Sequence, residues 1–143
     1  MHALLYRSRA RPGLLASDLN DVIETAEARN PAIGVTGLLL YGELAAVPGA
    51  PGEFVQWIEG PEETVEALYA EIEDDDRHFE PTVLRRGPVE DLLSDSGLRT
   101  DADRLFPSWS MGLVRLAELP ATLDGFLRFV AEWDGEAYPV LAA

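Results

Sequence analysis

An α+β fold with a single sheet is predicted by three features of the 143-residue chain. Short segments that alternate apolar and polar residues are typical of half-buried strands. They are interspersed with segments whose apolar residues recur at helical spacing, and proline or glycine separates most of these segments. A chain of this length with 47% hydrophobic residues suits one domain with one core.

The predicted elements follow from these patterns in chain order. Strands are expected over 2–8, 34–42, 54–60, 81–86 and 105–114, and helices over about 18–29, from Pro61 to the acidic run 73–76, and over about 122–133. Long loops are expected at 42–53, which is rich in Pro-Gly pairs, and at 87–103, which has room for one helical turn. This order predicts a ferredoxin-like sandwich (βαββαββ) with an added strand and a C-terminal capping helix.

The helix ends are predicted from capping residues. Ser17 is the expected N-cap of the first helix, and Asn30-Pro31 is its expected end, because the residue before a proline avoids the α region. Pro61 is expected at the first position of the second helix. The carboxylates of 73–76 at the end of that helix oppose its dipole, which indicates another use or a basic neighbour.

Composition narrows the functional classes. The formal net charge is −15, and a chain this acidic repels phosphate backbones and anionic lipid heads, so we expect no nucleic-acid or membrane partner. There is no cysteine, and the two histidines, His2 and His78, do not stand at metal-ligand spacing, so we expect no metal site. Neither a signal peptide nor a membrane span is recognisable, and we expect a cytoplasmic protein.

Two polar side chains stand on strand faces that should point towards the helices. Tyr6 shares its face of the first strand with Leu4, and Gln56 shares its face of the third strand with Ile58. The predicted topology places these two strands side by side, so Tyr6 and Gln56 can meet. A glutamine amide both donates and accepts hydrogen bonds and can exchange its two ends by turning. The pair is therefore a candidate switchable hydrogen bond beside a slot for a flat ligand.

Five segments together resemble the BLUF domains, a family of blue-light sensors that use FAD. The segments are LLYRSRA (4–10), ARNPAIGVTGLLLY (28–41), FVQWIEG (54–60), EIEDDDRH (71–78) and FPSWSMGL (106–113). Each segment alone is weakly specific, but the ordered set is specific. The resemblance implies a flavin-binding domain over 1–114, followed by a helix and tail over 115–143 that pack on the same domain.

The resemblance also implies roles for single residues. Tyr6 would donate an electron to the photoexcited flavin, and Gln56 would then rearrange and strengthen its hydrogen bond to the ring. Asn30 would hold the ring, and Trp109 and Met111 would respond to Gln56, with either of the two facing the flavin in the dark. The remaining implied cofactor-binding residues are Asp75, Arg77 and His78, and Arg29, which precedes Asn30, could reach the ring edge or the phosphates. Because the ring stays oxidised, light should cause a small red shift of its absorption.

The resemblance implies a photoreceptor without enzymatic activity, which signals through a protein partner or a change of oligomer. Two alternatives from other classes stay open. An acylphosphatase-like enzyme shares the topology but needs a Gly-rich first loop that this chain lacks. A degenerate ferredoxin-like interaction module would have lost the flavin altogether.

Two further groups of side chains allow both a functional and a structural interpretation. Glu59 and Glu63 could form a carboxylate pair for acid-base chemistry, but a solvated strand end and helix start is the simpler interpretation. Phe126, Phe129 and Trp133 in the last helix could contact a partner, but we expect them to pack on the open face of the sheet.

Overall fold

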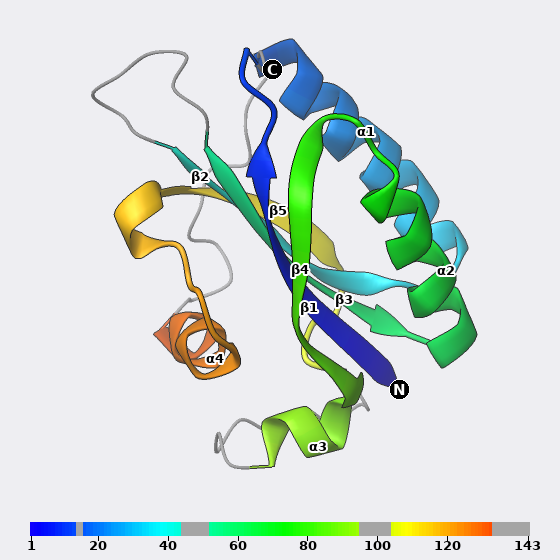
Figure 1. Ribbon diagram of the computed structural model, residues 1–143. Helices are drawn as coiled ribbons and strands as arrows, with labels where there is room; N and C mark the ends of the chain where they lie inside the picture. The colour runs from blue at the N-terminus through cyan, green and yellow to red at the C-terminus, as the bar shows by residue number, and fades with distance from the viewer. Residues whose placement is uncertain (14–15, 44–51, 95–103, 133–143) are drawn as a thin grey trace.

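The computed structural model describes residues 1–13, 16–43, 52–94 and 104–132, and these form one sheet with helices on both faces (Figure 1). The strands are β1 (His2–Ala10), β2 (Thr36–Glu43), β3 (Glu53–Gly60), β4 (His78–Pro88) and β5 (Trp109–Arg115). The helices are α1 (Ala16–Ala32), α2 (Glu62–Glu73), α3 (Val89–Leu93) and α4 (Leu123–Glu132), with a 3-10 turn, η1 (Leu116–Glu118), before α4.

The strand order confirms the predicted ferredoxin-like fold. The five strands lie in the order β4-β1-β3-β2-β5. β1 pairs antiparallel with both β3 and β4, and β2 pairs antiparallel with β3. β5 is the added strand, and it pairs parallel with β2 at one edge of the sheet.

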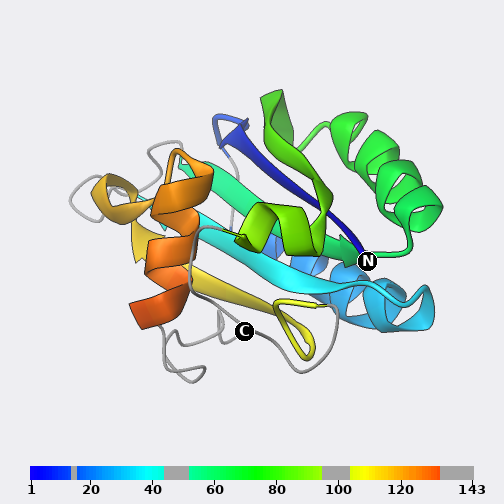
Figure 2. The same cartoon turned by 90° about the horizontal axis from the view of Figure 1, so that it is seen from below.

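The two faces of the sheet carry separate cores. α1 and α2 lie together on one face, whereas α3 and α4 lie on the other (Figures 1 and 2). Alternation along each strand divides the side chains between these faces: Leu5 and Trp57 join the core under α3 and α4, whereas Leu4 and Ile58 join the core under α2. Phe126 of α4 is fully buried and stacks on Trp57 at 5.8 Å between ring centroids, as predicted for the open face. Trp133 lies outside the described residues.

The predicted end of the first helix is wrong. α1 continues through Pro31 to Ala32 and includes Ser17, which was the expected cap. The helix is ended by Gly34, which has the left-handed φ of +75°. The N–H of Val35 donates to the carbonyl of Asn30 at 2.8 Å, and the N–H of Gly34 donates to the carbonyl of Pro31 at 3.2 Å. These two bonds form a Schellman motif, which needs a residue without steric cost at positive φ.

Other boundaries also differ from the predictions. β4 runs from His78 to Pro88 and is longer than predicted. Register shifts against β1 and the positive φ of Glu80 (+53°) let the strand continue through residues that do not pair regularly. β5 begins only at Trp109, and Pro61 is the N-cap of α2 rather than its first residue.

The two predicted long loops are only partly described. Residues 44–51 and 95–103 lie outside the described residues, and the helical turn expected within 87–103 is α3. None of the described helices is long and apolar enough to cross a membrane.

The prediction that Glu59 is solvated is also wrong. Its side chain lies at the end of β3 and is completely buried. It accepts hydrogen bonds from groups that arrive from β2, from β3 itself and from the segment before β5. The sequence gives no sign of this burial, because two of the donors are backbone amides 46 and 47 residues further along the chain.

Candidate functional site

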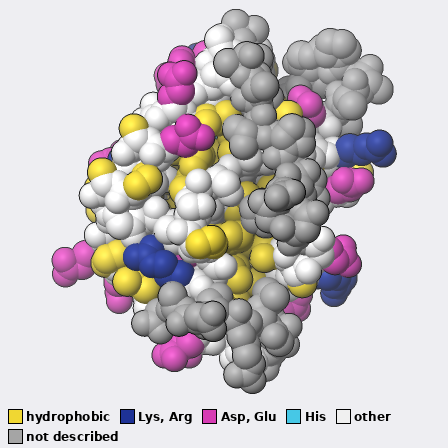
Figure 3. Space-filling view, turned by 180° about the vertical axis from the view of Figure 1, so that it is seen from behind, with side chains coloured by type: hydrophobic (Ala, Val, Ile, Leu, Met, Phe, Trp, Pro, Cys, Tyr) yellow, Lys and Arg dark blue, Asp and Glu magenta, His cyan; other side chains and the backbone are white. Residues whose placement is uncertain are grey.

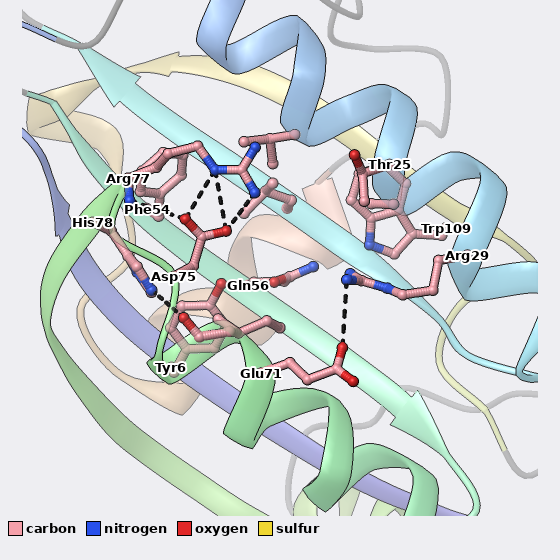
Figure 4. A pocket seen from close by; sticks show the side chains of 14 residues that line it. Tyr6, Thr25, Arg29, Phe54, Gln56, Glu71, Asp75, Arg77, His78 and Trp109 are labelled. Atoms are coloured by element: carbon pink, nitrogen blue, oxygen red, sulfur yellow. Dashed lines mark hydrogen bonds and ion pairs between the residues drawn. The ribbon is translucent and has the colours of Figure 1, made fainter.

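A pocket that opens to solvent lies between α1, α2 and the sheet. Seven of the residues singled out in the sequence line it: Tyr6, Arg29, Gln56, Asp75, Arg77, His78 and Trp109 (Figure 4). Asn30 and Met111 are not among the described residues that line it, although both are buried next to those that do.

Tyr6 and Gln56 form a buried hydrogen bond at the sheet surface of the pocket. They are direct cross-strand partners in the β1–β3 register, so the backbone pairing brings their side chains together. The Tyr6 hydroxyl donates to Gln56 Oε1 at 2.7 Å. Both side chains are about 4% exposed. The contact predicted from the two strand faces is thus present.

Burial holds the proton on Tyr6. Desolvation of the phenol raises the pKa of Tyr6 far above its ordinary value, nearby Tyr69 and Asp75 raise it further, and Arg29 only partly opposes them. The phenol therefore keeps its proton at physiological pH, and in this structure it donates to the Gln56 carbonyl oxygen. The amino end of the Gln56 amide is left for other partners in the pocket (Figure 4).

Two buried nitrogens beside the pocket have no hydrogen-bond partner among the described residues. They are Asn30 Nδ2 and Trp109 Nε1. Asn30 is fully buried, and its Oδ1 accepts from Arg29 Nε at 3.1 Å. Buried donors are nearly always paired, since an unpaired one costs about 1–3 kcal/mol. The two nitrogens are therefore donors suited to a ligand with acceptor atoms.

Arg29 reaches across the pocket from α1 towards α2. Its Nη1 lies 3.9 Å from Glu71 Oε2, and both residues line the pocket (Figure 4). This loose ion pair joins the two helices over the space between them. Because the side chain of Glu71 is 70% exposed, the pair contributes little to stability and can yield to a ligand.

Asp75 and Arg77 form a tight ion pair just beyond α2. Both carboxylate oxygens of Asp75 accept from the Arg77 guanidinium, and Asp75 Oδ1 also accepts from the Arg77 backbone N–H at 2.9 Å. The hydrogen bonds from Arg77 lower the pKa of Asp75, and those to Asp75 raise the pKa of Arg77. This basic partner accounts for Asp75 within the acidic run at the end of α2, and the pair fixes the guanidinium at the pocket wall.

His78 is fixed by two partners at the start of β4. Its Nε2 lies 2.5 Å from the Ile72 carbonyl oxygen, and its Nδ1 lies 2.7 Å from Ser8 Oγ. A carbonyl oxygen only accepts, so Nε2 carries a proton. His78 thus ties α2 to β1 and β4, and its ring lies edge-on to Tyr6 at 6.2 Å.

Trp109 is the β5 residue that lines the pocket. It stands opposite Gly37 in the parallel pairing with β2, whereas Met111 stands opposite Leu39. Met111 packs in the core beneath α1 and is 3% exposed. The sequence left open whether Trp109 or Met111 lies at the pocket. In this structure Trp109 lines the pocket and Met111 lies in the core.

Sequence reasoning missed several lining residues that spacing could have found. Thr25 precedes Arg29 by four residues, and Glu71 precedes Asp75 by four, so each shares a helix face or its extension with a residue already singled out. The apolar wall is completed by Val22, Ala26, Leu39, Phe54 and Ile72.

These features define a class of protein before any comparison. The pocket combines apolar walls, unpaired buried donors, a turnable amide and a guanidinium. This donor set fits a planar heterocycle with acceptor atoms along one edge, such as the ring of a flavin. No group of acidic or histidine side chains among the described residues could hold a metal ion. The site is that of a ferredoxin-like domain for an aromatic ring ligand.

Comparisons with known proteins agree with a site for a flavin ring. A family model for BLUF, described as sensors of blue-light using FAD, matches residues 1–112. The photoactivated adenylate cyclase subunit beta of Euglena gracilis is 34% identical over 93 residues, which are 65% of this chain and 10% of that protein. The dark-state structure of BlrB, a BLUF protein, has a TM-score of 0.60 at 30% identity and covers 94% of this chain and 86% of BlrB. Klebsiella pneumoniae BlrP1 with FMN and cyclic diGMP has a TM-score of 0.59 at 28% identity and covers 91% of this chain and 29% of BlrP1.

This chain belongs to the BLUF family of flavin-binding blue-light sensors. The family is one of sensors, which confirms the prediction of a light sensor rather than an acylphosphatase-like enzyme. The chain spans about a tenth of the length of the first curated relatives that it matches.

Proposed function

We propose that this protein binds FAD in the pocket between α1 and α2 and acts as a photoreceptor whose switch is the Tyr6–Gln56 pair. The observation that carries the proposal is the 2.7 Å hydrogen bond from the Tyr6 hydroxyl to Gln56 Oε1 at the pocket surface. The family description names FAD, and the BlrP1 structure is described as containing FMN. The flavin ring is the part that these two cofactors share.

The residues around the pocket would hold the ring in distinct ways. Asn30 Nδ2 and Trp109 Nε1 supply donors that have no partner in the described part of the chain. Arg77, held by Asp75, supplies a fixed guanidinium that suits an acceptor edge. Arg29 can leave its loose pairing with Glu71 and turn towards the ligand. Apolar side chains of α1 and the sheet exclude water from the rest of the ring surface.

The bound flavin would supply absorption of blue light and, once excited, an acceptor for one electron. Tyr6 is placed to give that electron, because its phenol lies at the pocket surface without solvent. The phenol proton can move along the existing hydrogen bond to Gln56 Oε1. When the electron and the proton return to Tyr6, no net chemistry remains, but the Gln56 amide has been free to turn and exchange its ends. The lasting change is a hydrogen-bond pattern, which is a local switch.

The signal is proposed to pass to another protein. Curated relatives named as cyclase subunits are about ten times longer than the stretch they share with this chain, which supports transmission from such a domain to an effector. The partner of this chain, or a change in its oligomer, would read the altered position of β5, because Trp109 lies on both the pocket wall and the sheet edge.

The proposal is tested by absorption spectra of the purified protein in the dark and after blue light. We expect an oxidised-flavin spectrum that undergoes a small, reversible red shift, and chromatography of the released cofactor should identify FAD. Tyr6→Phe should keep the bound flavin but lose the red shift, because the phenol oxygen that donates to Gln56 is gone. Thr25→Val is the matched control, since Thr25 lines the pocket but lies outside the pair, and it should keep the shift.

Each part of the proposal has its own contrary result. A colourless protein that cannot be reconstituted with flavin would favour the interaction module. A flavin that bleaches instead of shifting would indicate redox chemistry. An undiminished red shift in Tyr6→Phe would remove Tyr6 from the switch.

A further inference from the structure

Glu59 is a buried carboxylate outside the flavin pocket. It lies near the end of β3, on the face of the sheet opposite Gln56, because it is an odd number of residues away from it. Its side chain is completely buried. A buried carboxylate costs folding free energy unless its oxygens are well paired, so its partners show what it is for.

Four donors point at the two oxygens of Glu59. Oε1 accepts from Trp57 Nε1 at 3.0 Å and from the Leu105 backbone N–H at 2.6 Å. Oε2 accepts from Thr36 Oγ1 at 2.9 Å and from the Phe106 backbone N–H at 2.7 Å. We call this set of five residues the Glu59 clasp. Both oxygens act only as acceptors, which is the pattern of an ionised carboxylate.

A positive charge lies one hydrogen bond away from the carboxylate. Arg104 Nη1 donates to Thr36 Oγ1 at 3.0 Å, and Thr36 in turn donates to Glu59. The same nitrogen of Arg104 lies 3.4 Å from the backbone oxygen of Glu59. The clasp and Arg104 therefore hold the chain at three consecutive residues, 104 to 106, shortly before β5.

The clasp determines where β5 enters the sheet. β5 has one pairing partner among the described strands, β2, and its first paired residue is Trp109 opposite Gly37. The Gly37 N–H donates to the Ser108 carbonyl at 3.2 Å. Only the short segment between Phe106 and Trp109 separates the clasp from the pocket wall. Displacement of the clasped amides would thus move Trp109, whose indole N–H has no partner among the residues that the structure describes.

The clasp also contacts α4, which lies on the face of the sheet away from the pocket. Trp57, one of the donors, stacks on Phe126 of α4 with ring planes 3° apart. Phe106, another residue of the clasp, meets the same ring edge-on at 6.4 Å. The carboxylate thus joins the entry of β5 to the packing of α4.

We propose that Glu59 is a positioning residue: through the Leu105 and Phe106 amides it sets the place of Trp109 in the flavin pocket and couples that place to α4. The proposal rests on the proposed photoreceptor function for its consequence in light, but its structural part does not require flavin. Glu59→Gln is the sharpest variant. It preserves the volume but turns one acceptor oxygen into an NH₂ group, which then faces two donors.

The test measures indole and backbone amide signals by NMR in the flavin-free protein. The chain has three tryptophans, Trp57, Trp109 and Trp133, whose indole signals are assigned by single replacement with Phe. In Glu59→Gln we expect the Trp109 indole signal to shift along with that of Trp57, and the Leu105 and Phe106 amides to exchange about tenfold faster. Leu92→Ala in α3 is the control, because it opens the same core but removes none of the hydrogen bonds to Glu59, and it should leave the Trp109 signal unchanged.

A second variant keeps the test decisive if Glu59→Gln does not fold. Thr36→Val removes one donor and leaves both backbone amides paired, so a smaller shift of the Trp109 signal is expected. If the Trp57 signal moves in either variant while the Trp109 signal does not, Glu59 is only a structural carboxylate and the proposal is overturned.

Light then tests the coupling separately. In flavin-loaded protein, Glu59→Gln should change the rate of dark recovery, whereas Leu92→Ala should not. An unchanged rate would overturn the link to the switch. If the wild type shows no red shift at all, the proposed function fails, while the signals of the flavin-free protein still decide whether Glu59 positions Trp109.

Discussion

Asn30 carries a buried amide donor that lowers the stability of the flavin-free protein but is available to bind a ligand. It is fully buried, its Nδ2 has no partner among the described residues, and α1 extends two residues beyond Asn30, where its end was expected. The Schellman motif uses the Asn30 carbonyl for Val35, so the backbone there is satisfied while the side-chain amide is not. The residue therefore offers a ready donor at the cost of stability.

Replacement of Asn30 should affect stability and binding in opposite directions. Asn30→Leu keeps the size and removes the unpaired Nδ2 donor. It also removes the acceptor of Arg29 Nε, but the Arg29 side chain is partly exposed and can bond to water instead. The flavin-free protein should therefore unfold at an equal or higher temperature. Flavin affinity should fall by about tenfold or more, since one hydrogen bond of ~1–3 kcal/mol is lost. Thermal unfolding of flavin-free protein and titration with FAD measure the two effects. A lower unfolding temperature together with unchanged affinity would contradict this assignment.

At the scale of elements, the end of α1 depends on one glycine. Gly34 occupies the left-handed conformation at φ +75°, and nothing lies within 4 Å of the position where a Cβ would stand. The cost of a side chain is therefore conformational rather than steric with neighbours. The position matters to the site because the turn that follows α1 leads directly into β2, which pairs with both β3 and β5.

Gly34→Ala should destabilise the protein by about 1 kcal/mol, because a residue with a Cβ pays that cost in the left-handed region. Gly34→Asn should cost less, since asparagine tolerates that conformation. Urea unfolding of the two variants beside the wild type gives the order. Equal stability of all three proteins would show that the Schellman motif is not required.

The elements that the sequence predicts well are those in which the spacing of apolar residues agrees with the positions of the glycines and prolines that end each segment. β1 and β3 alternate cleanly, so the Tyr6–Gln56 contact could be inferred from their faces and the expected topology. The end of α1 was missed because the rule for residues before proline was weighed above the glycine three residues after Pro31. The start of β4 was missed because Pro81 obscures a strand that continues through irregular register. Glu59 could not be predicted, since its burial depends on amides brought from a distant segment.

For the molecule as a whole, acidity is the dominant property. The net charge is −15. Figure 3 shows acidic side chains spread around one face of the molecule, with few basic ones among them. Arginines at the pocket are paired locally with Glu71 and Asp75, so they do not offset this distributed charge. Repulsion among the remaining carboxylates opposes the compact state.

Added salt should therefore stabilise this protein. The free energy of unfolding should rise as NaCl is raised from about 0.02 to 0.5 M, because the Debye length falls from roughly 20 Å to about 4 Å and screens the repulsion. Urea unfolding at each salt concentration measures the change, with sucrose at matched osmolarity as the control for effects other than charge. A fall in stability with salt would show that attractive pairs outweigh the net repulsion.

The position of β5 in the strand order has a consequence for synthesis of the chain. The strands β1 to β4 are encoded within the first 88 residues, but β5 is the last of the described strands to be made and joins the edge next to β2. On the ribosome, a nascent chain can therefore complete the βαββαβ portion before Trp109 emerges. Pairing of β5 with β2 spans about seventy residues, which raises the contact order and slows folding. The wall of the pocket that bears Trp109 is thus the last part to close, and light sensitivity should be acquired only at the end of folding.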